Sequence, residues 1–136
     1  KEGRESVLEG VPMSLPAMVK AYRIQDKVRG VGFDWDNVNQ VWEKVEEEIA
    51  ELKHELNNGH DKDRTEDEFG DLLFALINYA RFIDVNPETA LERTNRRFIS
   101  RFKHLEKAVN ADGKDLHQMN LAEMDVYWEK AKQAEG

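Results

Sequence analysis

The sequence predicts an all-α protein, a bundle of four or five helices, and three observations support that fold class. No stretch alternates apolar and polar residues for long enough to indicate a β-strand. Residues 38–56 repeat apolar side chains with the 3.6-residue period of an α-helix. The stretch "LLFALINYARFI", residues 72–83, is apolar on nearly every side, which is typical of a buried helix.

The first helix is predicted at residues 15–28. Pro12 and Pro16 flank its start, and Ser14 is the predicted N-cap, because a serine hydroxyl can accept a hydrogen bond from the first helical turn. The segment "RGVGFDWDN", residues 29–37, contains two glycines and interrupts the helical pattern. We therefore expect a loop there, followed by a second helix.

The second helix is predicted at residues 38–56, with Asp36 or Asn37 as its N-cap. Asn58-Gly59 predicts its end, because glycine readily adopts the conformation that closes a helix. The third helix is predicted at residues 65–83 and contains the apolar stretch. So small a chain has few other elements to cover that helix. We therefore expect a dimer in which it is buried between subunits.

A fourth helix is predicted from Pro87 to about residue 109, because proline suits the first turn of a helix. The loop "NADGKD" follows, and a short last helix is predicted at residues 120–133. At the other end of the chain, segment 1–13 is polar and has no clear apolar stripe. It is predicted to be a linker, so the predicted folded domain covers residues 14–136.

The composition favours one helix-rich domain in the cytoplasm. The chain has 136 residues, 35% of them charged and 40% hydrophobic, which is enough for a hydrophobic core. Its net charge of -8 argues against general binding to nucleic acids or membrane surfaces, which favour basic proteins. It has no cysteine, which excludes disulfides and thiolate metal sites. No signal peptide or membrane-spanning run is apparent in the sequence.

The glutamates of the stretch "KVEEEIAELKHE" are not equivalent when the second helix is projected at 100° per residue. Glu48 falls at the edge of the apolar stripe. Glu51 and Glu55 lie on the same flank, whereas Glu47 points further toward solvent and Glu46 lies on the far side. Glu48 is therefore the glutamate that we expect nearest the core.

The third helix carries a narrow polar strip on an otherwise apolar surface, formed by Glu68, Asp71 and Asn78. A partly buried charge is costly unless it is paired or coordinates a metal. Carboxylates from two helices could surround divalent cations with oxygen ligands, which Mg²⁺ prefers. The alternative is a solvated helix face with i,i+4 ion pairs, such as Lys44 with Glu48 and Arg64 with Glu68.

The fourth helix places Arg93, Arg97 and Arg101 at i, i+4 and i+8, with Asn95 at the edge of the apolar stripe. Arginine suits multidentate contacts with phosphate, and phosphate oxygens suit a site rich in metal ions. The equally weighted alternative is that these arginines pair with the acidic surface.

Trp128 is either a core residue or a platform for a planar ring, with Lys132 one turn further on. The same two interpretations apply to Trp35 and Phe33. The four histidines have no spacing typical of a metal or catalytic group.

Taken together, these residues resemble the MazG family of nucleoside triphosphate pyrophosphohydrolases. The family pattern EExxE followed by ExxD corresponds to "EEIAE", residues 47–51, and "EFGD", residues 68–71. The resemblance continues through "VGFDW", "GDLLFALIN", "TNRRFISRF" and "YWEKAK", and it covers nearly everything from Ser14 onward. It implies the C-terminal catalytic domain of a two-domain MazG protein.

The resemblance implies a dimeric all-α domain of the all-α NTP pyrophosphatase type, with Mg²⁺ as cofactor and Mn²⁺ as its substitute. The implied metal ligands and catalytic groups are Glu48, Glu51, Glu68 and Asp71. Glu47 belongs to the motif but points outward, and Asn78 is a further candidate. The implied substrate-binding residues are Asn95, Arg97, Arg101, Trp128 and Lys132. Arg97 stands where the family frequently has lysine.

The implied reaction is hydrolysis of nucleoside triphosphates, ribo- or deoxyribo-, to a monophosphate and pyrophosphate. A metal-activated water would attack the α-phosphorus, with Glu51 or Glu48 as candidate proton acceptor. A stacking tryptophan predicts broad base specificity. Two alternatives stay open: a non-enzymatic acidic dimerisation or interaction module, and a narrower dUTPase-like or phosphoribosyl-ATP pyrophosphohydrolase.

Overall fold

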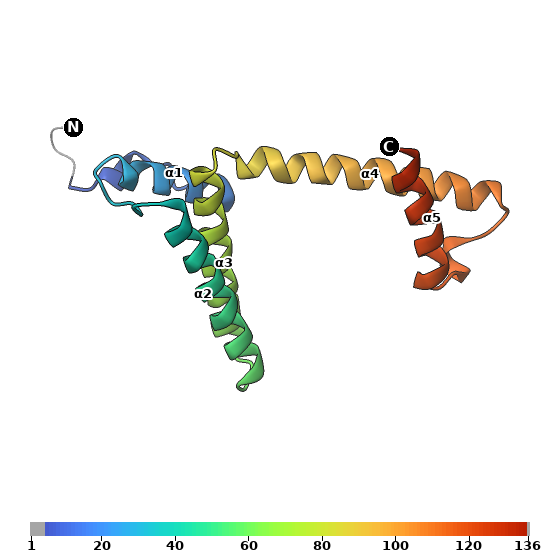
Figure 1. The fold of residues 1–136 in the computed structure, drawn as a ribbon, viewed down its shortest axis with the longest axis horizontal. Helices are drawn as coiled ribbons and strands as arrows, with labels where there is room; N and C mark the ends of the chain where they lie inside the picture. The colour runs from blue at the N-terminus through green and yellow to red at the C-terminus, as the bar shows by residue number, and fades with distance from the viewer. Residues whose placement is uncertain (1–4, 136) are drawn as a thin grey trace. The chain divides into compact units, whose positions relative to one another are not determined.

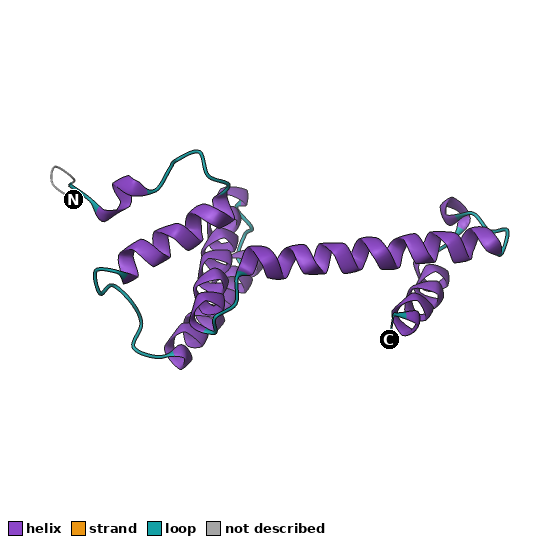
Figure 2. Ribbon diagram, turned by 90° about the horizontal axis from the view of Figure 1, so that it is seen from above, coloured by secondary structure: helices purple, strands orange, loops and turns teal. Residues whose placement is uncertain are grey.

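Every regular element in the computed structural model is helical, within the residues that it describes, 5–135 (Figure 2). The five α-helices are α1 (Ala17–Arg29), α2 (Val38–Asn57), α3 (Lys62–Phe82), α4 (Pro87–Ala111) and α5 (Leu121–Ala134). Two short 3-10 helices, η1 (Val7–Gly10) and η2 (Leu116–Gln118), complete the elements of this part of the chain. The predicted all-α class and its five helices are confirmed. None of the described helices is long and apolar enough to cross a membrane.

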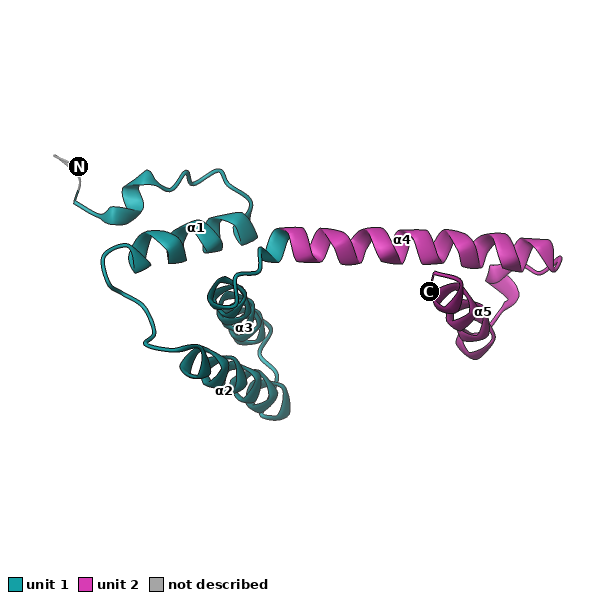
Figure 3. Ribbon diagram, turned by 45° about the horizontal axis from the view of Figure 1, so that its top comes forward, with its two compact units in different colours: residues 1–88 teal, residues 89–136 magenta. Residues whose placement is uncertain are grey.

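The chain divides into two compact units, Lys1–Glu88 and Thr89–Gly136 (Figure 3). The predicted linker, residues 1–13, lies at the start of the first unit. Its residues 1–4 are outside the described part of the chain. Within the rest, η1 forms a helical turn and Val11 is buried. The domain boundary at residue 14 stays a prediction.

The start of α1 differs from the sequence prediction. Its N-cap is Pro16, which makes no side-chain hydrogen bond, so the prediction of Ser14 as the cap is wrong. A residue that precedes proline is disfavoured in the helical conformation, so the helix begins only after Pro16. The Lys20 amide donates to the Pro16 carbonyl at 2.8 Å, which is the first bond of the helix.

The start of α2 agrees with the prediction. Asn37 is its N-cap, and the Asn37 Oδ1 atom accepts from the Gln40 amide at 3.1 Å. The Gln40 side chain in turn accepts from the Asn37 amide, which completes a capping box. At the other end of α2, Asn58 and Gly59 close the helix, and Gly59 has a φ of 93°. The start and the end of α2 are therefore both determined by short sequence signals.

Helices α3 and α4 end in the same way. The Val85 amide donates to the Ala80 carbonyl at 2.8 Å, and the Lys114 amide donates to the Val109 carbonyl at 3.1 Å. Both are the long bond of a Schellman motif, in which the preceding residue adopts a left-handed conformation. That residue is Asp84 (φ 59°) after α3 and Gly113 (φ 71°) after α4. Only the second is a glycine.

In the first unit, α2 and α3 lie side by side as a helical hairpin (Figure 1). Val41 and Val45 of α2 are almost fully buried, as is Ile77 of α3. Trp42 contacts Tyr79 with ring centroids 5.0 Å apart. Each fully buried aliphatic side chain contributes about 1.5–3 kcal/mol of hydrophobic stabilisation. This packing holds the facing surfaces of the two helices at a fixed separation.

Helix α3 keeps a large apolar surface exposed in the single chain. α2 packs along it, and α1 packs against it, with the Gln25 side-chain amide donating to the Phe74 carbonyl at 2.9 Å. Phe69 is nevertheless 50% exposed, and Leu73, Phe74 and Leu76 are also exposed. The apolar stretch of the sequence therefore does form a helix, but one that the other helices of the first unit do not cover.

The second unit has its own small core, in which Leu105, Val109 and Tyr127 are buried. Trp128 packs against this core. The Tyr127 hydroxyl donates to Asp112 Oδ2 at 2.6 Å, and this hydrogen bond, together with desolvation, raises the pKa of Tyr127 above its ordinary value. The bond links α5 to the end of α4 and so fixes the position of Trp128 within the unit.

Candidate active site

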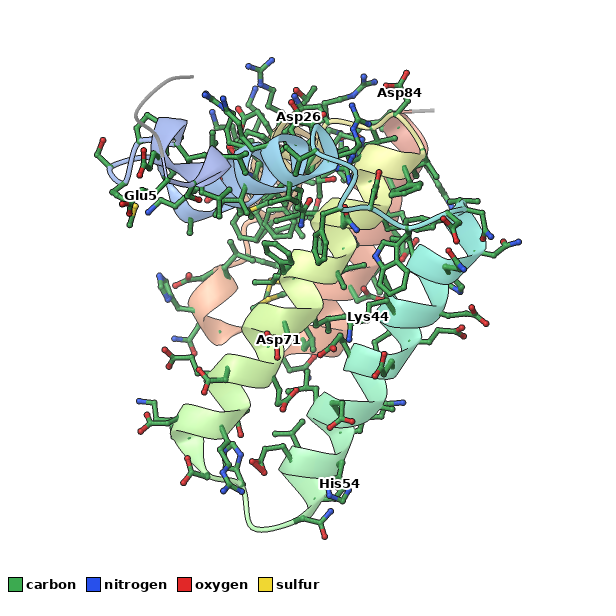
Figure 4. All side chains as sticks on the ribbon, turned by 90° about the vertical axis from the view of Figure 1, so that its left-hand side faces the viewer. Glu5, Asp26, Lys44, His54, Asp71 and Asp84 are labelled. Atoms are coloured by element: carbon green, nitrogen blue, oxygen red, sulfur yellow. The ribbon has the colours of Figure 1, made fainter. Side chains whose placement is uncertain are left out.

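Three carboxylates converge between α2 and α3. Glu48 comes from α2, and Glu68 and Asp71 come from α3. Each offers one carboxylate oxygen, and these three oxygens lie within 4.8 Å of one another. Glu48 faces α3 because it follows the buried Val41 and Val45 on the same stripe of α2. Figure 4 shows Asp71 on α3 at a similar level to Lys44 on α2, with His54 nearer the loop that joins the helices.

The carboxylates of this acidic cluster (Glu48, Glu68 and Asp71) differ in burial. Glu48 is 7% exposed, Glu68 is half-buried and Asp71 is exposed. The pKa of Glu68 is raised, first by desolvation and then by the negative charges of Asp71 and Glu51, with smaller contributions from Glu48 and Glu55. Like charges therefore oppose one another in this cluster, and a bound cation would relieve that repulsion.

Lys44 is the positive charge closest to Glu48. Its Nζ atom lies 3.0 Å from Glu48 Oε1 and 3.3 Å from Glu47 Oε2. The hydrogen bond with Glu48 is the main reason that the pKa of Lys44 is raised, and it outweighs the opposing effect of desolvation. Glu47 is exposed on the outer side of this contact, as its projection predicted. Glu46 is also exposed, on the side that the projection assigned to solvent.

Glu51, the fourth predicted metal ligand, is not among the three converging carboxylates. It is exposed and lines a cavity of about 400 Å³ beside them. We call this the hairpin cavity. Its lining residues are Glu51, His54, Glu55, Asn58, Arg64, Asp67 and Glu68. Glu68 belongs to both the acidic cluster and the cavity, so the two adjoin.

Asn78, the further candidate on the polar strip of the third helix, accepts a hydrogen bond from an arginine. The Arg81 guanidinium donates to Asn78 Oδ1 at 2.7 Å and to Asp34 Oδ1 at 3.3 Å. Asn78 therefore helps to hold Arg81. The role of Arg81 was missed at the sequence level. The signal was an arginine inside the apolar stretch, three residues after a polar Asn78 on the same helix.

The predicted substrate-binding residues all belong to the second unit. Arg101 Nε lies 2.7 Å from Glu135 Oε2, and Arg97 donates to Thr94 Oγ1 at 3.2 Å. Asn95 and Lys132 are exposed. Arg101 thus forms an ion pair with a carboxylate, which was the alternative interpretation of its charge.

Trp128 packs within the second unit, as one of its two predicted roles requires. Its ring lies 5.0 Å from that of Phe98 and packs against the core of the second unit. It is only half-buried, so part of its surface remains accessible.

The donor set of the acidic cluster fits a hard divalent cation. Its three ligand atoms are all carboxylate oxygens, and no histidine belongs to the group found within residues 5–135. Mg²⁺ and Mn²⁺ prefer oxygen ligands, whereas a structural Zn²⁺ site usually includes sulfur or nitrogen. Glu48, Glu68 and Asp71 could therefore hold such an ion, with positions left for other ligands.

The sequence model of the MazG nucleotide pyrophosphohydrolase domain matches residues 37–106, just over half of the chain. This region contains α2, α3 and most of α4. The chain belongs to the MazG family. The matched region includes all three cluster carboxylates and both Arg97 and Arg101, whereas Trp128 and Lys132 lie beyond it.

Curated relatives agree with the family assignment. The chain is 45% identical, over 118 residues, to the nucleoside triphosphate pyrophosphohydrolase/pyrophosphatase MazG of Thermotoga maritima, a match covering 87% of this chain and 45% of that protein. It is 38% identical, over 136 residues, to the nucleoside triphosphate pyrophosphohydrolase of Escherichia coli K12, covering 99% of this chain and 52% of that protein. The chain thus spans about half the length of these relatives.

A third relative of this MazG domain is the uncharacterized protein YabN of Bacillus subtilis. The two are 44% identical over 130 residues, which cover 96% of this chain and 27% of YabN. A sequence similar to this chain therefore also occurs within YabN, which is longer than the first two relatives.

Proposed function

We propose that this MazG domain hydrolyses nucleoside triphosphates to nucleoside monophosphate and pyrophosphate, with Mg²⁺ as its cofactor. The convergence of Glu48, Glu68 and Asp71 carries the proposal, because all three lie in the region that the family model matches. Two relatives whose names state this activity support it. The proposal extends to ribo- and deoxyribonucleotides and to broad base specificity.

In this proposal Glu48, Glu68 and Asp71 hold the cation, and Glu51 is its fourth candidate ligand from the adjoining cavity. A bound Mg²⁺ would neutralise phosphate charge and make water a better nucleophile at neutral pH. Mn²⁺ has the same preference for oxygen and would substitute. The acidic cluster is otherwise repulsive to a triphosphate, so the activity requires the metal.

The hydrolysis begins as a water oxygen forms a bond to the α-phosphorus. The bond between the α-phosphorus and the bridging oxygen breaks, and pyrophosphate leaves with that oxygen. Glu51 is the favoured proton acceptor, because it is exposed beside the cluster, whereas Glu48 is buried and hydrogen-bonded to Lys44. A carboxylate within hydrogen-bond reach of the water can perform this role.

Asn95, Arg97 and Arg101 are proposed to bind the triphosphate, and Trp128 and Lys132 to bind the nucleoside. Arg101 would exchange Glu135 for a phosphate, to which its guanidinium can donate two hydrogen bonds. The accessible part of Trp128 would stack on a base of any kind, since every base has a π-face. These residues would then recognise the triphosphate and would discriminate little between one base and another.

The proposal also includes a homodimeric, bundle-like arrangement of helices and a cytoplasmic site of action. The exposed apolar side chains of α3 support the dimer, because burying such a surface stabilises subunit association.

The deciding experiment measures pyrophosphate and inorganic phosphate released from a panel of canonical and modified nucleoside triphosphates. Pyrophosphate should be the product, and chelation of divalent cations should abolish its release. Glu68→Gln and Asp71→Asn should each lower kcat/KM about a hundredfold or more, since even outer-shell partners of a metal contribute 10–100-fold. Glu46→Gln is the matched control, because Glu46 is exposed on α2 away from the cluster, and it should remain active.

The alternatives predict other results. A non-enzymatic interaction module would release no pyrophosphate from any nucleotide with Mg²⁺ or Mn²⁺. A dUTPase-like or phosphoribosyl-ATP-specific enzyme would release it from a single substrate of the panel. Normal activity in Glu68→Gln and Asp71→Asn would remove the acidic cluster from the mechanism.

A further inference from the structure

A buried arginine fixes the orientation of the Asn78 side chain on α3. The Arg81 side chain is 4% exposed, and its Nη2 atom donates to Asn78 Oδ1 at 2.7 Å. A guanidinium has only donors, so the atom of Asn78 that faces it must be the amide oxygen. The Asn78 Nδ2 atom has no hydrogen-bond partner within residues 5–135. Asn78 is half-buried, so an oriented amide donor is left for a ligand.

Holding Asn78 in this way is costly for the chain. The Nε and Nη1 atoms of Arg81 are buried and lack a hydrogen-bond partner in the described part of the chain. A buried donor without an acceptor destabilises a fold. The ion pair of Arg81 with Asp34, at 3.3 Å, uses the same Nη2 atom and leaves those two donors unpaired. Incompletely paired groups of this kind are typical of functional sites more than of a structural core.

Asn78 lies on the same face of α3 as Asp71 of the acidic cluster. The two residues are separated by about two helical turns, which is a rise of about 10 Å. Ala75 lies between them on this face and ends at its Cβ, so no long side chain separates them. A cation–oxygen bond of about 2 Å at Asp71, a phosphate with its sugar, and a hydrogen bond of about 3 Å at Asn78 together span this gap.

We propose that Asn78 binds the sugar of the substrate, with its Nδ2 atom donating a hydrogen bond to the 3′-oxygen. This inference rests on the proposed function, in which a cation at the acidic cluster activates the water that attacks the α-phosphorus. The sugar is bonded to that phosphate and therefore lies within reach of the cluster. The 3′-hydroxyl is the sugar hydroxyl that ribo- and deoxyribonucleotides share. This contact leaves the triphosphate to Arg97 and Arg101, and the base to Trp128.

The test measures kcat/KM for dATP and for dideoxyATP, which lacks the 3′-hydroxyl. The wild type should prefer dATP by about three- to tenfold, as expected for one hydrogen bond between neutral groups. Asn78→Ala should lose this preference, because its reaction with dATP alone becomes slower. Asp34→Ala is the control, since it removes the other partner of Arg81 and leaves the Asn78 amide in place. It should keep the preference for dATP.

The ratio of the two substrates separates sugar binding from support of the fold. If Asn78 only held Arg81, Asn78→Ala would slow both reactions equally, and that result would overturn the proposal. Equal kcat/KM for the two nucleotides in the wild type would overturn it without any variant. Calorimetry with the non-hydrolysable α,β-methylene analogues of dATP and dideoxyATP needs no turnover. A wild-type protein that hydrolysed nothing would refute the proposed function, while these two affinities would still decide whether the 3′-hydroxyl is bound.

Discussion

At the scale of single residues, Lys44 and Arg64 show how far helical spacing predicts an ion pair. Both are followed by a glutamate at i+4, yet Lys44 contacts Glu48 at 3.0 Å and Arg64 makes no such contact in the described chain. Glu48 is buried, so losing its partner would be costly, whereas half-buried Glu68 can be partly solvated. Spacing allows a pair, and the burial of the partner determines whether it is held.

Lys44→Met should destabilise the metal-free protein by about 1–2 kcal/mol, between the values for exposed and buried pairs, because Glu48 loses its positive partner. A divalent cation at the cluster would supply that charge instead. Mg²⁺ should therefore raise the free energy of unfolding more in Lys44→Met than in the wild type. Urea denaturation with and without Mg²⁺ measures both effects.

The control for this experiment is Lys53→Met, because Lys53 is exposed on the same helix and forms no ion pair within residues 5–135. It should match the wild type under both conditions. An equal loss of stability with and without Mg²⁺ in Lys44→Met would mean that the cation does not act at Glu48.

At the scale of helices, the sequence predicts where elements stop more reliably than which side chains meet. Asn37, Asn58-Gly59 and Pro87 bound their helices as predicted, since caps and prolines act within a few residues. Glu51 was assigned to the metal site by the family resemblance, and the projection placed it on the same flank of the helix as Glu48. A projection gives angles about one helix axis only, whereas the crossing of α2 and α3 brings Glu48 close to Glu68 and Asp71.

The Schellman ends of α3 and α4 make a matched comparison of residue types. Asp84 adopts the left-handed conformation that Gly113 adopts after α4. A side chain strains that conformation, so Asp84→Gly should stabilise the protein by about 0.5–1 kcal/mol. The free energy of unfolding from denaturant titration measures the effect.

Gly113→Ala is the reciprocal variant. An added Cβ at this position would meet no atom within 4 Å, so any loss reflects backbone conformation alone. We expect a loss of about 1 kcal/mol. If both substitutions left stability unchanged, the left-handed geometry would not be the controlling factor at these helix ends.

At the scale of the whole molecule, the fold class, the helix number and the acidic pattern were predictable, because they depend on local periodicity and short motifs. The contact of Arg81 with Asp34 was not, since 47 residues separate the two and neither motif nor period links them. The exposed apolar surface of α3 was predictable only in general terms. The sequence has more apolar residues in this helix than its few other elements could cover.

That surface gives a test of the predicted dimer. Sedimentation velocity over a range of protein concentrations should show a dimer that dissociates on dilution. Leu73→Glu, which places a charge among exposed apolar side chains of α3, should shift the protein toward monomer. Leu121→Glu alters an exposed leucine of α5 and serves as the control. A wild-type protein that is monomeric at every concentration would refute the predicted dimer.

The three tryptophans are distributed so that fluorescence can follow the two units separately. Trp42 contacts Tyr79 in the first unit, Trp128 contacts Phe98 in the second, and Trp35 lies in the loop before α2. Replacing Trp35 and Trp42 with phenylalanine leaves one emitter, which reports only on residues 89–136. The chain thus contains its own optical probes for asking whether its halves melt in one cooperative step or in two.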